Sequence, residues 1–250
     1  MADWLDMVFE DDALVVVNKP AGLVCHPTKG GDDSSVVGRM RLTFGGGHEV
    51  HLLNRLDRET GGLLLMAKGR EAAGELRRLF DRGSMEKEYR AIVRGWPVAD
   101  EASMTGSIGM ATNSVVAVRR AVCADGKPAR TDYRVCRRFD REEGRFAEVQ
   151  LFPRTGRTHQ IRVHLEAAGH PIVGDKIYGG DGEDYLAFIR RGLSVERRRS
   201  LMLPFHALHA QRVRFDWRGR AWVFEVLPEP WFDRFLSGDP VDVDWRQCHA

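Results

Sequence analysis

Hydrophobic and polar positions along the chain predict many strands and few helices. Residues 13–18 are a β-branched run and residues 62–67 an apolar run, and both are typical of buried strands. Residues 88–94 alternate as a half-buried strand does, and Arg218-Gly219 is typical of a hairpin turn. The full set of expected extended segments is 13–18, 23–26, 62–67, 88–94, 114–121, 129–137, 145–152, 206–217 and 221–227.

Helical spacing is confined to a few segments. Residues 71–82 place Ala72, Leu76, Leu79 and Phe80 on one stripe, with charges elsewhere. Helices are expected over 34–44, 71–82, 158–168 and 228–235, with a charged helical insertion over 181–204. Residues 97–114 are small, polar and contain glycine, so an irregular connection is expected there. This order predicts a mixed α+β fold, read as one domain over residues 1–250.

Composition and charge narrow the class of protein. The chain is 43% hydrophobic and 30% charged, which is typical of a soluble globular protein and excludes collagen, a coiled coil and a disordered tail. No apolar run reaches the roughly 20 residues of a membrane span, and the acidic N-terminus is unlike a signal peptide, so a cytoplasmic location is expected.

The net charge of +2 is unevenly distributed. Residues 51–150 hold 19 basic and 15 acidic groups, and residues 151–220 hold 13 and 7, between acidic ends. Of the 38 basic residues, 32 are arginine, which pairs with phosphates and stacks on bases. A basic middle of this kind favours an anionic ligand or nucleic acid.

The cysteines do not predict a metal site. Cys25, Cys123, Cys136 and Cys248 are far apart, and a zinc site needs clustered ligands. His159 and His164 lie five residues apart, not the four of a helical zinc pair. We therefore expect neither a structural nor a catalytic metal.

The segment Asn54–Lys68 carries the most informative chemistry. Asp57 lies between two arginines, before a Thr-Gly-Gly turn that leads into a buried strand. A rigid position at the mouth of a strand is typical of reactive groups, and a lone nucleophilic aspartate fits this segment. Two other interpretations stay open: a surface Arg–Asp pair, and a hydrolytic carboxylate pair formed with Glu59.

Two further segments carry candidate side chains. Residues 154–165 place Arg157, His159, Arg162 and His164 at a helix start, which favours anions; the alternative is an ordinary basic surface helix. Tyr89 lies in an alternating strand. It is either a core aromatic residue or a ring on which a planar base stacks, with a hydroxyl able to act on a proton.

Together these segments resemble the RluA-type RNA pseudouridine synthases. The similar segments are Val16–Gly22 with His26-Pro27, Asn54–Gly62, Lys87–Gly95, Arg157–Leu165 with Gly169–Gly179, and Leu208–Ala210. The resemblance implies a mixed, largely antiparallel central sheet flanked by helices, with a central RNA-binding cleft. It also implies isomerisation of uridine to pseudouridine within RNA, without cofactor or metal.

The resemblance assigns roles to individual residues. Asp57 is the implied nucleophile, acting at C1′ or at uracil C6, or else as a base at C2′. Arg162 would pair with Asp57, and Tyr89 would stack on a flipped uracil and take the C5 proton. Leu208 would line the pocket. The residues expected to contact the RNA are Arg55, Arg58, Arg157 and His159.

The sequence departs from the family pattern at two positions, and the resemblance also implies which partners to expect. Asn54 stands where the family commonly has histidine, and Thr60-Gly61-Gly62 where it commonly has Thr-Ser-Gly. The family pattern begins by about residue 8, so no S4-like module is expected before it. The implied partner is structured RNA, ribosomal or transfer or both, bound by a monomer without an obligatory protein partner. A non-catalytic RNA-binding module of the same fold is the competing interpretation.

Overall fold

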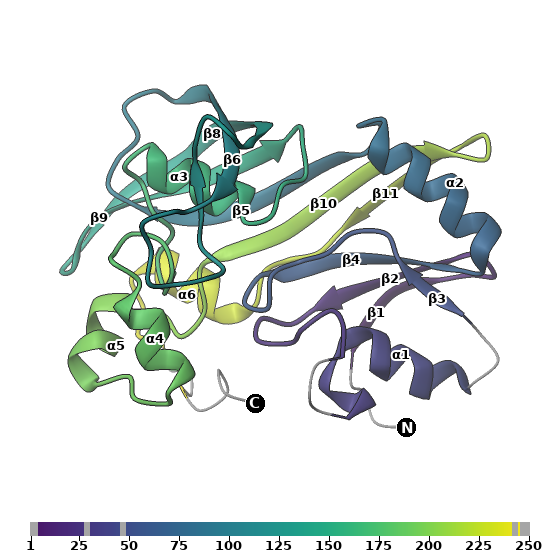
Figure 1. Ribbon diagram of the computed structural model, residues 1–250, viewed down its shortest axis with the longest axis horizontal. Coiled ribbons are helices and arrows are strands. Elements are labelled where there is room, and N and C mark those ends of the chain that lie inside the picture. Colours follow the sequence, from purple (N-terminus) through teal and green to yellow (C-terminus); the bar gives the residue numbers. More distant parts are fainter. Residues whose placement is uncertain (1–4, 28–30, 46–48, 242–244, 246–250) are drawn as a thin grey trace. The chain divides into compact units, whose positions relative to one another are not determined.

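The apolar run that follows Asp57 forms β4 (Gly61–Lys68), which is buried almost throughout. A computed structural model describes residues 5–27, 31–45, 49–241 and 245. The chain divides into two compact units (Figure 1). The first comprises residues 1–87 and 209–229, and the second comprises residues 88–208 and 230–250. Whether the chain is a single domain stays a prediction.

The sheet of the first unit is built around β4. β2 (Leu14–Lys19) runs antiparallel to it, and β1 (Asp6–Glu10) runs antiparallel to β2. β3 (Val50–Leu52) also pairs with β4. The hairpin of β10 (Leu208–Trp217) and β11 (Arg220–Glu225) joins from late in the chain, and β10 runs parallel to β4 at Gly61 and Gly62.

Helices α1 (Val36–Phe44) and α2 (Arg70–Asp81) belong to this unit, with the short 3-10 helix η1 (Asp32–Ser34) before them. Ser35 caps α1, because its hydroxyl accepts a hydrogen bond from the Gly38 amide at 3.0 Å. Ala72 and Leu76 of α2 pack into the same apolar core as Leu65 of β4 and Phe215 of β10. The expected stripe of α2 is therefore the one that covers the sheet.

The second unit carries a purely antiparallel sheet in the order β5-β9-β8-β6-β7. The strands are β5 (Glu86–Arg94), β6 (Glu101–Met110), β7 (Arg120–Val122), β8 (Lys127–Arg141) and β9 (Gly144–Pro153). The helices are α3 (Gln160–Ala167), α4 (Glu183–Ile189), α5 (Val195–Leu201) and α6 (Pro230–Ser237). The α+β class is confirmed, and α4 and α5 are the charged helices expected over 181–204.

Two expectations about the second unit are wrong. Residues 97–114, expected to be irregular, contain the ten-residue strand β6. Only one of its ten residues is buried, so it lacks the apolar alternation that marks a strand, and its register comes from β8 instead. Residues 114–121, expected to be a strand, form turns up to β7, because Val116 anchors the segment in a small core beside Tyr178.

Short strands β1 and β3 were not expected either, because at five and three residues they are too short to show a clear apolar pattern. The expected extended segment 23–26 is reduced to a single bridge between Val24 and Ser35. In the part of the chain that the structure describes, no helix combines the length and apolar character that crossing a membrane requires.

Candidate active-site residues

The loop that carries Asp57 is fastened to β4 at its beginning. The Asn54 side-chain amide donates a hydrogen bond to the Leu63 carbonyl at 3.2 Å and accepts one from the Leu65 amide at 2.8 Å. One side chain thus supplies both a donor and an acceptor to the strand backbone. The asparagine at this position therefore has a structural role that fixes where the loop starts.

The loop is fastened to the turn after β2 at its far side. The Gly22 amide donates to the Arg58 carbonyl, and Arg58 Nε donates back to the Gly22 carbonyl, both at 2.9 Å. The Thr60 amide donates to the Asp57 carbonyl at 3.1 Å and closes the turn. Arg58 thus takes part in the structure of the loop, whereas Arg55 is exposed and Asp57 is half-buried.

A glycine is required where the loop enters β4. Gly62 has a φ of 107°, in the region that favours glycine. A Cβ atom at this position would overlap the Ala210 carbonyl of β10. The close approach of β4 and β10 therefore depends on the second glycine of the Thr-Gly-Gly turn.

Lys19 contacts this loop at the Arg58 carbonyl and is fully buried. Its ammonium group donates to the carbonyls of Pro20, Leu23 and Arg58 at 2.8–3.0 Å. Burial lowers the pKa of Lys19 to about 8, although the negative charges of Glu229 and Asp57 act to raise it. At neutral pH the buried cation therefore favours the ionised form of Asp57.

We expect Lys19→Met to destabilise the protein by about 2–4 kcal/mol, since three carbonyls lose their donor. The folded protein binds the Lys19 proton more weakly than the unfolded chain does. Wild-type stability relative to the variant should therefore rise between pH 8 and 10.5, by up to about 1.4 kcal/mol per pH unit. Urea unfolding of both proteins across this range measures the difference, and a difference independent of pH would contradict the burial of a titrating lysine.

Cys25 also contacts the loop, but as a packing residue. Its sulfur is 3.3 Å from the Leu56 carbonyl oxygen and 3.4 Å from the Leu56 amide nitrogen. Burial raises the pKa of the Cys25 thiol, so the group stays protonated at neutral pH. This cysteine therefore holds the backbone before Asp57 and is not an activated nucleophile.

Tyr89 and Leu208 belong to the second unit. Tyr89 is half-buried on β5, opposite Leu151 of β9, and packs against the main apolar core of this unit. Leu208 is 5% exposed and lies in the same core. Tyr89 thus has the core position considered for it from the sequence, and Leu208 also packs in that core. The roles of Tyr89 toward a uracil ring and of Leu208 in lining the pocket stay predictions.

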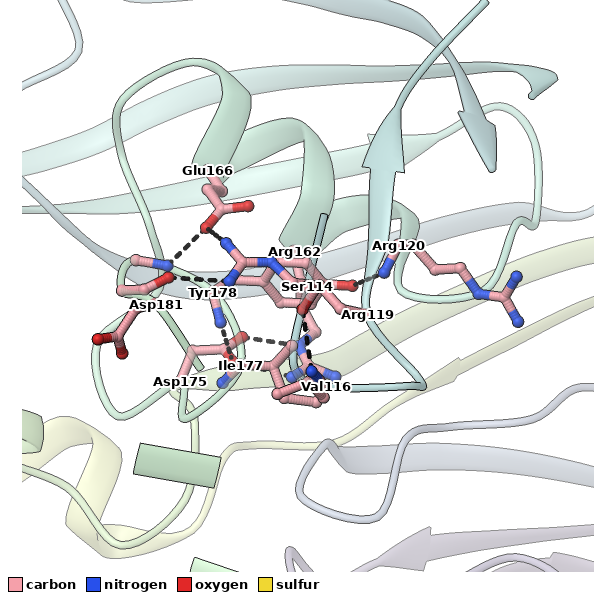
Figure 2. Close-up of polar contacts among 12 residues, drawn as sticks. Ser114, Val116, Arg119, Arg120, Arg162, Glu166, Asp175, Ile177, Tyr178 and Asp181 are labelled. Atoms are coloured by element: carbon pink, nitrogen blue, oxygen red, sulfur yellow. Dashed lines mark hydrogen bonds and ion pairs between the residues drawn. The ribbon is translucent and has the colours of Figure 1, made fainter. Parts of the chain in front are cut away.

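Arg162 forms a buried ion pair with Asp175, a residue that the sequence analysis did not single out. Arg162 Nε lies 2.7 Å from Asp175 Oδ2, and Nη2 lies 2.9 Å from Oδ1 (Figure 2). The Asp175 carboxylate also accepts from the amides of Ile177 and Tyr178. Burial alone would raise the pKa of Asp175, but the charge and hydrogen bonds of Arg162 hold it well below its usual range.

The signal for this partner was present in the segment 169–179, which holds an aspartate thirteen positions after Arg162. Nothing in the spacing distinguished this carboxylate from the others near the helix. The expected pairing of Arg162 with Asp57 joins residues of different units and stays a prediction.

Tyr178 links several of the predicted residues, and it too was missed. Its hydroxyl lies 2.8 Å from His159 Nδ1 and accepts a hydrogen bond from the Arg120 amide at 3.0 Å. The Arg162 guanidinium lies over its ring, 4.9 Å from the centroid. Tyr178 is buried, so its ring and hydroxyl together fix the positions of His159 and Arg162. His164, in contrast, is buried against Thr131.

A basic pocket of about 340 Å³ opens beside this cluster. Its lining residues are Ile108, Gly109, Arg120, Asp125, Gly126, Lys127, Arg157 and Thr158. Arg157 is held toward it by a hydrogen bond from Nε to the Pro128 carbonyl at 3.2 Å. Arg120 Nε is buried and lacks a hydrogen-bond partner among the residues that the structure describes. An anion with several oxygens would satisfy that donor.

Metal-binding side chains do not gather in the described ranges: no group of three or more histidine, cysteine or acidic residues is placed to hold an ion there. At the Asp57 loop itself there are a carboxylate, a buried ammonium group and backbone amides.

Comparison with known proteins identifies relatives of one kind. A family model described as RNA pseudouridylate synthase matches residues 13–167. An uncharacterised RNA pseudouridine synthase of Aquifex aeolicus is 35% identical, over 98% of this chain and 74% of its own length. The dual-specificity RNA pseudouridine synthase RluA of Vibrio parahaemolyticus is 36% identical, over 70% of this chain and 69% of its own.

Other relatives are longer than the matched region. The ribosomal large subunit pseudouridine synthase D of Zymomonas mobilis is 35% identical, over 84% of this chain but 64% of its own length. Among solved structures, human RNA pseudouridylate synthase domain containing 1 aligns with a TM-score of 0.72 and 28% identity. That alignment covers 94% of this chain and 86% of the human one.

Proposed function

The chain belongs to the RluA-type family of RNA pseudouridylate synthases, which are isomerases, and on this premise we propose that it converts specific uridines of structured RNA to pseudouridine with Asp57 as the nucleophile. The observation that carries the proposal is the loop of Asp57. Backbone and side-chain hydrogen bonds fix this loop on both sides, while Asp57 itself stays half-buried. A rigid scaffold with a reachable carboxylate suits nucleophilic catalysis.

The proposed reaction conserves atoms and electrons. The bond between N1 and C1′ breaks, the uracil turns, and a bond forms between C5 and C1′. The proton leaves C5 and N1 gains one, so neither oxidant nor reductant is consumed. Asp57 acts at C1′, at C6 or on the proton at C2′, and all three steps require the ionised carboxylate. The buried charge of Lys19 supports that state.

The proposal assigns supporting roles in the second unit. Tyr89 stacks on the uracil and takes the C5 proton. Arg162, whose orientation is held by Asp175 and the Tyr178 ring, pairs with Asp57 in the reacting complex. The target uridine leaves its stack to reach these groups, as nucleobase-modifying enzymes require.

The proposed substrate class is ribosomal or transfer RNA. One relative is named for the large ribosomal subunit, which supports ribosomal RNA as a substrate. Another is named a dual-specificity enzyme, which supports more than one kind of RNA target. The longer relatives carry chain beyond the matched region, so their choice of RNA does not transfer directly.

The proposed function is tested with ribosomal and transfer RNA labelled with tritium at uracil C5. The protein should release tritium and leave pseudouridine at defined positions, detected by chemical mapping of the same RNA. It should release no free base or nucleotide. Release of free uracil would indicate the hydrolytic interpretation, and RNA binding without tritium release would indicate the non-catalytic one.

The basic pocket of the second unit suits a phosphate of the same RNA, because Arg120, Lys127 and Arg157 line it. We expect Arg157→Gln and Lys127→Gln each to weaken binding of all RNA sequences alike. Each variant should reduce the slope of log K against log salt concentration by about 0.7–0.9. Filter-binding titrations at several salt concentrations measure this slope. Arg70→Gln, which changes an exposed arginine of the first unit, is the matched control, and a pocket variant with the control's slope would contradict the assignment.

A further inference from the structure

Gly61 is the first glycine of the turn after Asp57, and the space beside it is occupied. A Cβ atom at this position would lie 2.8 Å from Glu229 Oε2 and 3.2 Å from His209 Nδ1. The first of these distances is too short for non-bonded carbon and oxygen atoms, so a side chain at position 61 would displace the Glu229 carboxylate. Glu229 lies just after β11, within the first unit.

A shift of the Glu229 carboxylate would strain a hydrogen bond made by the same group. Its other oxygen, Oε1, accepts a hydrogen bond from the Ala21 amide at 2.8 Å. Charge-assisted hydrogen bonds of this kind are about twice as strong as neutral ones. One oxygen of Glu229 thus lies against Gly61 and the other is bonded to Ala21. A side chain at position 61 would therefore affect the turn at Ala21.

The turn at Ala21 is hydrogen-bonded to the loop of Asp57. The next residue, Gly22, exchanges two hydrogen bonds with Arg58, and Lys19 donates to the same Arg58 carbonyl. A shift of the Ala21 amide therefore reaches the backbone adjoining Asp57 through one residue. The position of the Asp57 carboxylate matters, since a displacement of 1 Å at a reacting group can lower a rate about a hundredfold.

We propose that Glu229 is a positioning residue for the Asp57 loop, and that Gly61 is glycine in this chain because the Glu229 carboxylate needs its space. The catalytic part of this inference rests on the proposed function. The structural part, that Glu229 orders the turn and the loop, does not.

The inference predicts a specific pattern among four variants. Gly61→Ser should displace Glu229 and so should resemble Glu229→Ala, with kcat lowered about tenfold to a hundredfold and RNA affinity unchanged. The double variant Gly61→Ser/Glu229→Ala should be no worse than either single one, because both remove the same bond. Glu229→Gln should retain most of the activity, since its carbonyl oxygen still accepts from Ala21. Glu225→Ala, on the exposed edge of β11, is the matched control.

Amide hydrogen exchange tests the structural part without reference to activity. The Gly22 and Thr60 amides, bonded to Arg58 and Asp57, should exchange about tenfold faster in Gly61→Ser and Glu229→Ala than in the wild type and in Glu229→Gln. Unchanged exchange, or single effects that multiply in the double variant, would overturn the inference. Absence of tritium release by the wild type would instead overturn the proposed function, while the exchange result would still decide the role of Glu229.

Discussion

Replacing Asp57 by asparagine is expected to lower pseudouridine formation by about a thousandfold or more, while RNA affinity stays within a few-fold of the wild type. The amide keeps the size of the side chain but is not a nucleophile, and it carries no charge for Lys19 to stabilise. The loop should keep its shape, since it is fastened through the backbone of Arg58 and Thr60 and through Asn54. Tritium release gives the rate, and filter binding gives the affinity.

Glu59→Gln is the matched control for this experiment. Glu59 is a second carboxylate of the same turn, and only the hydrolytic interpretation requires it. The synthase interpretation therefore expects near wild-type activity from Glu59→Gln and a loss of about a thousandfold or more from Asp57→Asn. A fully active Asp57→Ala enzyme would refute the proposed nucleophile, and equal loss in the Glu59 variant would favour a carboxylate pair.

Replacing Asp175 by asparagine is expected to reduce the free energy of unfolding by about 3–5 kcal/mol, the largest stability effect predicted for this chain. The Asp175 side chain is 0% exposed. In Asp175→Asn the buried Arg162 guanidinium loses the negative charge of Asp175. For a protein of this size the loss corresponds to a fall in Tm of roughly 10 °C. Asp175→Ala should be worse, because the amides of Ile177 and Tyr178 lose their acceptor as well.

Thermal and urea unfolding of the Asp175 variants measure this effect. The matched control is Glu101→Gln, which breaks an exposed ion pair with Arg134 and should cost less than about 1 kcal/mol. Because the pKa of Asp175 is held below its usual range, the contribution of its charge is complete above about pH 4. It is lost only as the pH falls through the pKa of the folded state. An Asp175→Asn protein as stable as the control would show that the pair contributes little to folding.

The elements that the sequence predicts well carry a clear apolar pattern of their own. β4 is buried from Gly61 to Ala67, and α2 has a single apolar stripe. β6 has no such pattern, since only one of its residues is buried, and its place depends on pairing with β8. Residues 114–121 gave a false signal, because their valines are divided between a small core and solvent.

Residues of the candidate site likewise differ in whether the sequence alone marks them. Asp57 stands out because charge, turn and strand adjoin in the sequence, and the structure accounts for its neighbour Asn54 through bonds to β4. Asp175 and Glu229 do not stand out, since their partners lie elsewhere in the chain and only folding brings them together. Short-range patterns thus single out the residue that we propose as the nucleophile, and the structure is needed to show which residues hold its loop.

The hydrogen bond from the Ala21 amide to Glu229 also has a consequence for folding during synthesis, because it forms only after residue 229 has been made. It joins residues 208 positions apart, and β10 reaches β4 only after the whole second sheet has been made. At a synthesis rate of roughly 5–20 residues per second, Ala21 is made about 10–40 s before its partner. A growing chain on the ribosome therefore lacks this contact, and the geometry proposed for the Asp57 loop is complete only after residue 229 has been made.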